Sequence, residues 1–180
     1  SGKATKVAGD GTISGFELEG DTLVFTRNSM KSPDVLFAAR ADGSAVRKIS
    51  TNNDDKLAKV AWGDYEQFSF TGWNGEIVHG YVVKPANYVP GKKYPVAFLI
   101  HGGPQGSFGN GWSYRWNPQT YAGQGFAAVM IDFHGSTGYG QAFTDAISQH
   151  WGDRPLEDLQ KGWAAALAKY SFLDGDRACA

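Results

Sequence analysis

Two short runs of uninterrupted apolar residues place the strongest limit on the fold of this chain. Val96–Ile100 and Phe126–Ile131 contain no polar side chain, and a glycine-rich stretch comes after each of them. Strands that are apolar on both faces are typical of the centre of a parallel sheet covered on both sides. Between the runs, Asn117-Pro118 predicts the start of a short helix, which Gly123 and Gly125 end. The sequence therefore predicts a β-α-β crossover, the unit of an α/β fold.

The segments on either side extend this α/β prediction. Tyr65–Thr71 and Ile77–Lys84 are strand-like, and Asn74-Gly75 between them favours a hairpin turn. A long helix is predicted after Asp153 as cap, with Pro155 in its first turn. Its predicted buried stripe comprises Leu156, Leu159, Trp163, Leu167 and Tyr170. The acidic turn Asp174–Asp176 ends this unit, and a further strand is expected to begin at Arg177. Since the chain stops there, we expect a truncated sheet with an exposed apolar edge at Phe126–Ile131.

The first 60 residues show a different pattern, of short strands separated by turns. Asp42-Gly43 is a strong hairpin signal, Asn28–Asp34 reads as a loop, and Asn52–Lys59 reads as a charged linker. Four antiparallel strands in about 40 residues is the size of one β-propeller blade, which cannot bury both faces alone. Either further blades precede Ser1, or this is a small sheet packed on the α/β part of the chain. The predicted strands are Ile13–Leu18, Thr22–Arg27, Val35–Ala39 and Val46–Ile49.

Composition excludes several classes of function. The 17 Lys and Arg nearly balance the 18 Asp and Glu, so nothing indicates a nucleic-acid-binding surface. No apolar run is long enough to predict a membrane span. The single cysteine, Cys179, excludes an internal disulfide and a cysteine-rich zinc site. The four histidines lack a metal-ligand spacing, and no nucleotide-binding motif is present, so we expect neither metal nor cofactor.

The first glycine-rich stretch is the candidate for a catalytic loop. His101-Gly102-Gly103-Pro104 comes directly after a predicted central strand, where α/β sheets place their ligand sites. Glycine amides can come close to a ligand and donate to a developing oxyanion, as a related loop does in lipases and esterases. From its spacing alone, the stretch is either such an oxyanion loop or a simple turn.

Two further stretches bear on catalysis and substrate binding. Ser113, in Gly111–Arg115, is excluded as a nucleophile, because the motif ends in arginine and no strand precedes it. Trp112, Tyr114, Arg115 and Trp116 either line a substrate cleft or pack their loop onto the domain. Tyr139, in the second glycine-rich stretch Gly135–Gly140, is a further candidate for substrate binding.

Taken together, these motifs resemble the prolyl oligopeptidase family of serine peptidases, especially its dipeptidyl-peptidase-five and acylaminoacyl-peptidase branch. The resemblance covers nearly the whole chain. It implies that residues 1–60 end a β-propeller and that residues 61–180 form the first half of an α/β-hydrolase domain. The segments that carry it are Val96–Pro104, Trp112–Pro118, Ser136–Gly140, Trp151–Asp153 and Glu157–Leu159.

The resemblance implies an exopeptidase that cleaves short peptides near their N-terminus with a Ser-Asp-His triad. It places the Gly103 amide, with Gly102 beside it, in the oxyanion hole, and the whole triad beyond residue 180. At the position of His101 other branches carry a tyrosine whose hydroxyl assists, so His101 is a candidate contact. We therefore expect the 180 residues alone to be inactive and to need the rest of the enzyme.

Several alternatives stay open on the sequence alone. A carboxylesterase or lipase shares the loop, and a non-catalytic propeller-linked binding protein is the alternative from another class. The expected partner is a peptide substrate, and the resemblance leaves a homodimer of the full protein open. It favours a periplasmic or secreted location, with the cytoplasm as the alternative. His134 departs from the family, which usually has arginine there, so the detail of the second glycine-rich loop is in doubt.

Overall fold

The computed structural model of the chain describes residues 2–180 and divides into two compact units. The first contains the chain up to Val60 together with Asn110–Asn117, and the second contains Ala61–Gly109 and Pro118–Ala180. The sequence pattern had not assigned the segment 110–117 to the N-terminal part. Within residues 2–180, no helix is both long and apolar enough to cross a membrane.

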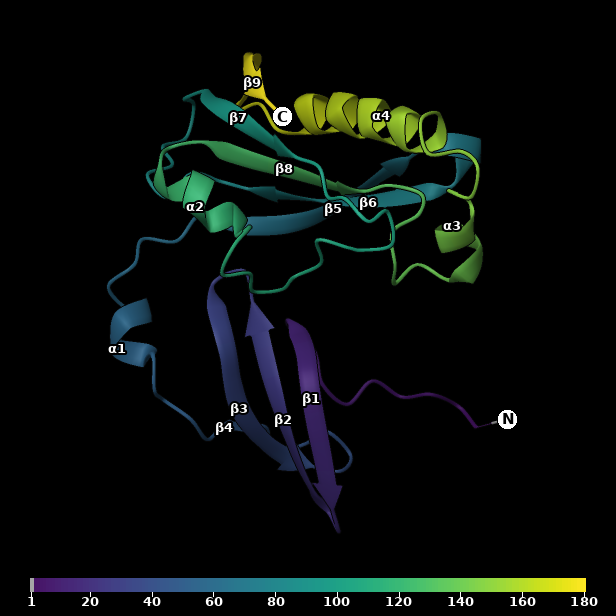
Figure 1. The fold of residues 1–180 in the computed structure, drawn as a ribbon. Helices are drawn as coiled ribbons and strands as arrows, with labels where there is room; N and C mark the ends of the chain where they lie inside the picture. The colour runs from purple at the N-terminus through teal and green to yellow at the C-terminus, as the bar shows by residue number, and fades with distance from the viewer. Residues whose placement is uncertain (1) are drawn as a thin grey trace. The chain divides into compact units, whose positions relative to one another are not determined.

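An antiparallel sheet of four strands, in the order β1-β2-β3-β4, forms the first unit (Figure 1). Its core lies on one face, where Phe25 and Phe37 pair across β2 and β3 with ring centroids 5.6 Å apart. The four predicted strands are confirmed, although the fourth is reduced to two residues. The strands are β1 (Thr12–Glu19), β2 (Thr22–Ser29), β3 (Ser32–Arg40) and β4 (Arg47–Lys48).

The loop predicted at 28–34 is wrong in its extent, because β2 and β3 continue until only Met30 and Lys31 lie between them. The tight turn is held by a segment remote in sequence. Met30 N donates to Asn110 Oδ1 at 3.2 Å, and Met30 O accepts from Asn117 Nδ2 at 3.2 Å. Met30 is only 1% exposed as a result. Local sequence could not show this support, since it comes from 80 residues further along.

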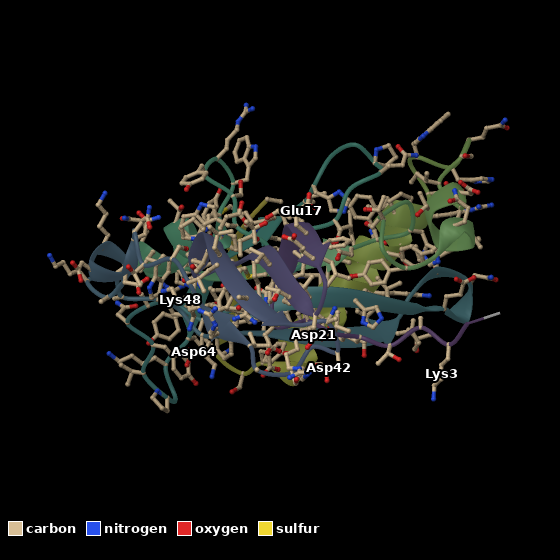
Figure 2. All side chains as sticks on the ribbon, turned by 90° about the horizontal axis from the view of Figure 1, so that it is seen from below. Lys3, Glu17, Asp21, Asp42, Lys48 and Asp64 are labelled. Carbon is tan, nitrogen blue, oxygen red and sulfur yellow. The ribbon has the colours of Figure 1, made fainter. Side chains whose placement is uncertain are left out.

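Charged side chains lie at the turns of the first unit. Asp21 and Asp42, labelled in Figure 2, lie in the turns after β1 and β3, and Asp21 pairs with Arg40 at 2.7 Å. The linker predicted at 52–59 contains one short helix, α1 (Asp54–Leu57), which corrects that prediction. Two acidic residues in its first turn favour the helix dipole, and Lys48 forms an ion pair with Asp54.

The second unit is built on a mixed sheet of five strands in the order β5-β6-β8-β7-β9. Helix α4 lies along one face of this sheet and α2 lies on the other side (Figure 1). β7 and β8 are parallel and joined through α2, as predicted, while β5 and β6 form the predicted hairpin. Its elements are β5 (Tyr65–Thr71), the 3₁₀ turn η1 (Trp73–Gly75), β6 (Ile77–Val83), β7 (Tyr94–Leu99), α2 (Pro118–Gly123), β8 (Ala127–Asp132), α3 (Gln141–Asp145), α4 (Arg154–Lys169) and β9 (Leu173–Cys179).

The expected exposed edge at 126–131 is wrong. β8 is the central strand, with β6 antiparallel on one side and β7 parallel on the other, and all six of its residues are buried. The sheet edges within this unit are β5 and β9 instead. The prediction failed because the antiparallel partner of β8 comes from a strand about 50 residues earlier in the chain, which periodicity cannot reveal.

Helix α4 agrees with the prediction in extent, and the predicted stripe is confirmed except at Leu156. Leu156 is 51% exposed, whereas Asp158, Gly162 and Ala166 are buried. The contact with the sheet therefore runs through small residues, and Leu159, Trp163 and Leu167 pack at its border. Asp153 precedes the helix without a side-chain cap, since its carboxylate pairs with His150 Nδ1 at 2.8 Å.

β9 begins earlier than predicted, at Leu173, so that the acidic turn lies inside the strand. Its pairing with β7 jumps from Asp174 to Ala178 between two neighbouring β7 residues, which leaves a bulge. The bulge is closed by Arg177 Nε, which donates to Asp174 Oδ2 at 2.8 Å and holds the pKa of Asp174 below its usual value.

Replacing Gly162 by alanine is expected to destabilise the protein, although alanine is the better helix former. An added Cβ would lie 2.7 Å from Ile131 Cδ1 and 2.7 Å from Phe70 Cζ. Overpacking of this kind costs about 1–3 kcal/mol, which exceeds the gain of about 1 kcal/mol in helix propensity. The measurement is denaturant unfolding, with Gly123→Ala in α2 as control because a Cβ there meets open space. Equal stability of the two variants would contradict the expected close packing.

Candidate active site

The first glycine-rich loop leaves the carboxyl end of β7 and returns over the carboxyl end of β8. Gly103 has φ +134, in the region that favours glycine, and the Gly103-Pro104 peptide is cis. A Cβ at Gly103 would lie 2.9 Å from Gln105 N, whereas one at Gly102 meets nothing within 4 Å. The loop conformation thus requires glycine at 103 for a local reason.

His101 packs into the base of this loop. Its ring stacks on Phe133 with centroids 4.4 Å apart, and its side chain is only 11% exposed. Nδ1 lies 3.0 Å from Gly102 O, and Nε2 lies 2.8 Å from Ser136 Oγ. Because a carbonyl oxygen only accepts, Nδ1 carries a hydrogen, and in the neutral ring Nε2 accepts from the serine hydroxyl.

Asp132, the last residue of β8, is 1% exposed and joins the two glycine-rich loops. Its carboxylate accepts from Ser107 Oγ at 2.8 Å, from Phe108 N at 2.8 Å and from Tyr139 Oη at 2.6 Å. A second link runs directly between the loops, where Thr137 N donates to Gly106 O at 2.8 Å. The first loop is therefore anchored by hydrogen bonds at both ends, through His101 at its start and through residues 106–108 at its far end.

Tyr139 is fixed by this arrangement. Its ring stacks on His79 with centroids 5.2 Å apart, and burial together with the hydrogen bond to Asp132 raises the pKa of its hydroxyl far above the usual value. Burial and the charge of Asp132 also raise the pKa of Tyr81. Both hydroxyls stay protonated at physiological pH, so Tyr139 is a hydrogen-bond donor here and not a base.

The chain matches known proteins over nearly its whole length. Residues 112–180 match the model of the prolyl oligopeptidase family. The chain is 37% identical over 173 residues to dipeptidyl-peptidase 5 of Aspergillus fumigatus, which covers 94% of this chain and 24% of the relative. Residues 112–180 thus resemble the prolyl oligopeptidase family, and the chain as a whole is similar to dipeptidyl-peptidase 5 proteins. It spans about a quarter of the length of the curated relatives that it matches.

Solved structures of two acylaminoacyl peptidases share the fold. An acylaminoacyl peptidase in complex with Z-Gly-Gly-Phe-chloromethyl ketone aligns with a TM-score of 0.83 at 24% identity, over 95% of this chain and 27% of that chain. The acylaminoacyl peptidase of Pyrococcus horikoshii aligns with a TM-score of 0.80 at 25% identity, over 92% of this chain and 26% of that chain.

The structure brings some of the predicted site residues together and separates others. His101 and Tyr139 both lie beside Asp132, at the base of the loop that carries Gly102 and Gly103. The remaining three candidates, Trp112, Tyr114 and Arg115, belong to the other compact unit.

The loop that contains these aromatic residues, Asn110–Asn117, packs on its own unit at one residue and is exposed at another. Trp112 N donates to Asn28 Oδ1 at 2.9 Å, which ties the loop to the four-stranded sheet, while Tyr114 is 86% exposed. The hydroxyl of Ser113 accepts from Trp116 N at 2.9 Å and so belongs to a turn.

Sequence reasoning missed Asp132, Ser107 and Ser136 as members of the site. The available signal was an acidic residue directly after a central apolar strand, at the end where parallel strands place their ligands. Nothing in the sequence indicated that its partners come from two different loops. Among residues 2–180, no group of three His, Cys, Asp or Glu side chains is arranged to hold a metal ion.

His134 is fully buried and lies between two carboxylates. Its Nδ1 lies 2.6 Å from Asp158 Oδ2, and its Nε2 lies 3.3 Å from Glu76 Oε2. Each ring nitrogen of His134 thus has a carboxylate oxygen within hydrogen-bonding distance. Asp158 also accepts from Trp73 N at 2.7 Å and from His134 N at 2.7 Å, which connects α4 to the η1 turn and to the end of β8.

Replacing Asp132 by asparagine is expected to destabilise the protein. The amide keeps the shape of the side chain but turns one acceptor oxygen into a donor. That donor faces either the N–H of Phe108, at the position of Oδ1, or the hydroxyls of Ser107 and Tyr139, at the position of Oδ2, so hydrogen bonds to the carboxylate are lost. Leaving a buried donor unsatisfied costs about 1–3 kcal/mol. Tyr139→Phe removes a single donor and should cost less. Chemical unfolding of both variants tests this order, and a larger loss for Tyr139→Phe would contradict it.

Stability is also expected to fall in acid through Glu76. A hydrogen bond from Asn74, together with one from His134, holds the pKa of Glu76 below its ordinary value of 4.5. Because the folded-state pKa is the lower one, this contribution is fully present above pH 4.5 and is lost as the pH falls through the folded value.

The variant Glu76→Gln should therefore lose stability near neutral pH and converge on the wild type in acid. Thermal melts between neutral and acidic pH measure this difference, with Glu17→Gln on the exposed strand β1 as control. A stability difference that stays constant with pH would show that the charge of Glu76 does not contribute.

Proposed function

We propose that this chain is part of a serine exopeptidase that hydrolyses short peptides near their N-terminus, as a dipeptidyl peptidase or an acylaminoacyl peptidase. The observation that carries the proposal is the loop at the carboxyl end of β7, in which Gly103 adopts a glycine-specific conformation on a base anchored by His101 and Asp132. The 37% identity to a dipeptidyl-peptidase 5 over 94% of the chain supports the peptidase class.

In this proposal the Gly103 amide, in the role that the family resemblance implies, donates to the oxyanion that forms when a peptide carbonyl is attacked. A single donor of this type contributes about 3–4 kcal/mol to transition-state stabilisation. The nucleophile, its base and the second oxyanion donor come from residues outside these 180. The chain therefore contributes electrostatic stabilisation and no covalent chemistry of its own.

The two compact units of the chain agree with a role as part of a larger peptidase. We propose that the four-stranded sheet is the last blade of a propeller and that the five-stranded sheet is the first half of an α/β-hydrolase domain. The apolar side chains Phe16 and Leu18, which are 69% and 56% exposed on β1, support a neighbouring blade that packs over them. The parallel pair β7 and β8, with its loops at one end, supports the hydrolase assignment.

Fluorophosphonate labelling read by intact mass tests the proposal. We expect the full-length protein to be labelled once and to hydrolyse dipeptidyl-nitroanilides, and residues 1–180 alone to do neither. Labelling with hydrolysis of p-nitrophenyl esters but not of peptides would indicate a carboxylesterase instead. Absence of label on the full-length protein would indicate a non-catalytic protein.

Replacing Gly103 by alanine in the full-length protein should lower kcat about 100-fold, comparable to the loss of one oxyanion donor. The reason is that the added Cβ meets Gln105 N at 2.9 Å and a side chain is strained at φ +134, so the amide must move. Dipeptidyl-nitroanilide kinetics measure the effect, and Gly123→Ala serves as the control. Full activity of Gly103→Ala would exclude this amide from the oxyanion hole.

A further inference from the structure

His101 is bonded on both sides of its ring to groups within the active-site loops. Nδ1–H donates to Gly102 O at 3.0 Å, and Nε2 meets Ser136 Oγ at 2.8 Å. Both ring nitrogens thus have partners inside the protein. The imidazole is therefore placed to hold the loop, and not to donate directly to a substrate.

His101 binds the carbonyl of Gly102, which shares a peptide unit with the amide of Gly103, the proposed oxyanion donor. Gly102 C=O and Gly103 N–H belong to the same planar unit and point in opposite directions. A hydrogen bond that fixes the carbonyl therefore also fixes the direction of the amide. Glycine on both sides of this unit would otherwise leave its plane free to rotate, because neither residue has a Cβ to restrict the backbone.

Two aromatic side chains fix the position of the imidazole ring. It stacks on Phe133 at 4.4 Å and meets Phe108 edge-on at 5.3 Å. Ser136, which holds Nε2, is fully buried, and Asp132 Oδ1 lies 3.8 Å from Nε2. The support therefore runs from β8 through Ser136 to the imidazole, and from the imidazole to the carbonyl of Gly102.

We propose that His101 is a positioning residue that aims the Gly103 amide at the oxyanion by holding the carbonyl of the same peptide unit. This inference rests on the proposed function, since it needs the Gly103 amide to be an oxyanion donor. It adds a role for the histidine side chain that acts through the backbone.

A residue that aims an oxyanion donor should affect kcat and leave KM nearly unchanged, because the donor is engaged mainly in the transition state. A residue that only stabilises the fold would lower the melting temperature and leave kcat per folded molecule unchanged. A residue that contacts substrate would raise KM. The three roles are therefore separable by measurement.

Two variants of the full-length protein separate the ring nitrogens. In His101→Asn, the amide nitrogen takes the place of Nδ1 and still donates to Gly102 O. In His101→Gln, the longer side chain takes the place of Nε2, so that it reaches Ser136 but not the carbonyl. We expect kcat for a dipeptidyl-nitroanilide to fall about 10- to 100-fold in His101→Gln and only a few-fold in His101→Asn, with KM nearly constant in both.

Equal losses in the two variants, or a loss confined to KM, would overturn the inference. If thermal melts show that either His101 variant does not fold, Ser136→Ala tests the inference instead. It removes the hydrogen bond to Nε2 of His101 but keeps the bond from Nδ1 to Gly102 O. That variant should lose kcat a few-fold at constant KM, as in His101→Asn, which also lacks the bond to Ser136. Unchanged kcat would overturn the inference.

The wild-type protein provides the check on the underlying function. If it hydrolyses the nitroanilide and takes the fluorophosphonate label, a negative result in the variants counts against the role of His101 alone. If it does neither, the proposed function fails, and the inference fails with it.

Discussion

A buried carboxylate that accepts hydrogen bonds from two separate loops is satisfied only when both loops are in place. Asp132 is such a group, since it binds Ser107 and Phe108 of one loop and Tyr139 of the other. Desolvation of a charge is costly, and the three donors offset that cost. The many glycines of the two loops give their backbones wide conformational freedom. Asp132, at the end of the central strand, restricts that freedom because it bonds to both loops at once.

The same principle acts a short distance away at His134. Asp158, buried in the middle of α4, accepts from the backbone of η1 and from both the backbone and the ring of His134. The second loop is therefore held at both ends, by the bond of Tyr139 to Asp132 and by that of His134 to Asp158.

Much of the local structure could be predicted because it depends on short-range patterns. The apolar runs predicted β7 and β8, Asn74-Gly75 predicted the β5–β6 hairpin, and Pro155 marked the start of α4. Predictions failed where a distant partner decided the outcome. The turn at Met30 is tight because Asn110 and Asn117 support it, and the buried face of α4 includes Gly162, outside the predicted stripe, because the sheet lies close there.

By itself the sequence determined most of the strands and the long helix α4, and that a glycine-rich loop comes after a central strand. It also carried the family resemblance, because motifs are local. Only the tertiary structure decided that β8 is the central strand, that Asp132 and Ser136 support the first loop, and that both nitrogens of His101 are bonded within the protein. The bonds that tie the first loop to Asp132 and Ser136 join residues at least 24 positions apart, and such contacts are set by the path of the chain and not by its local composition.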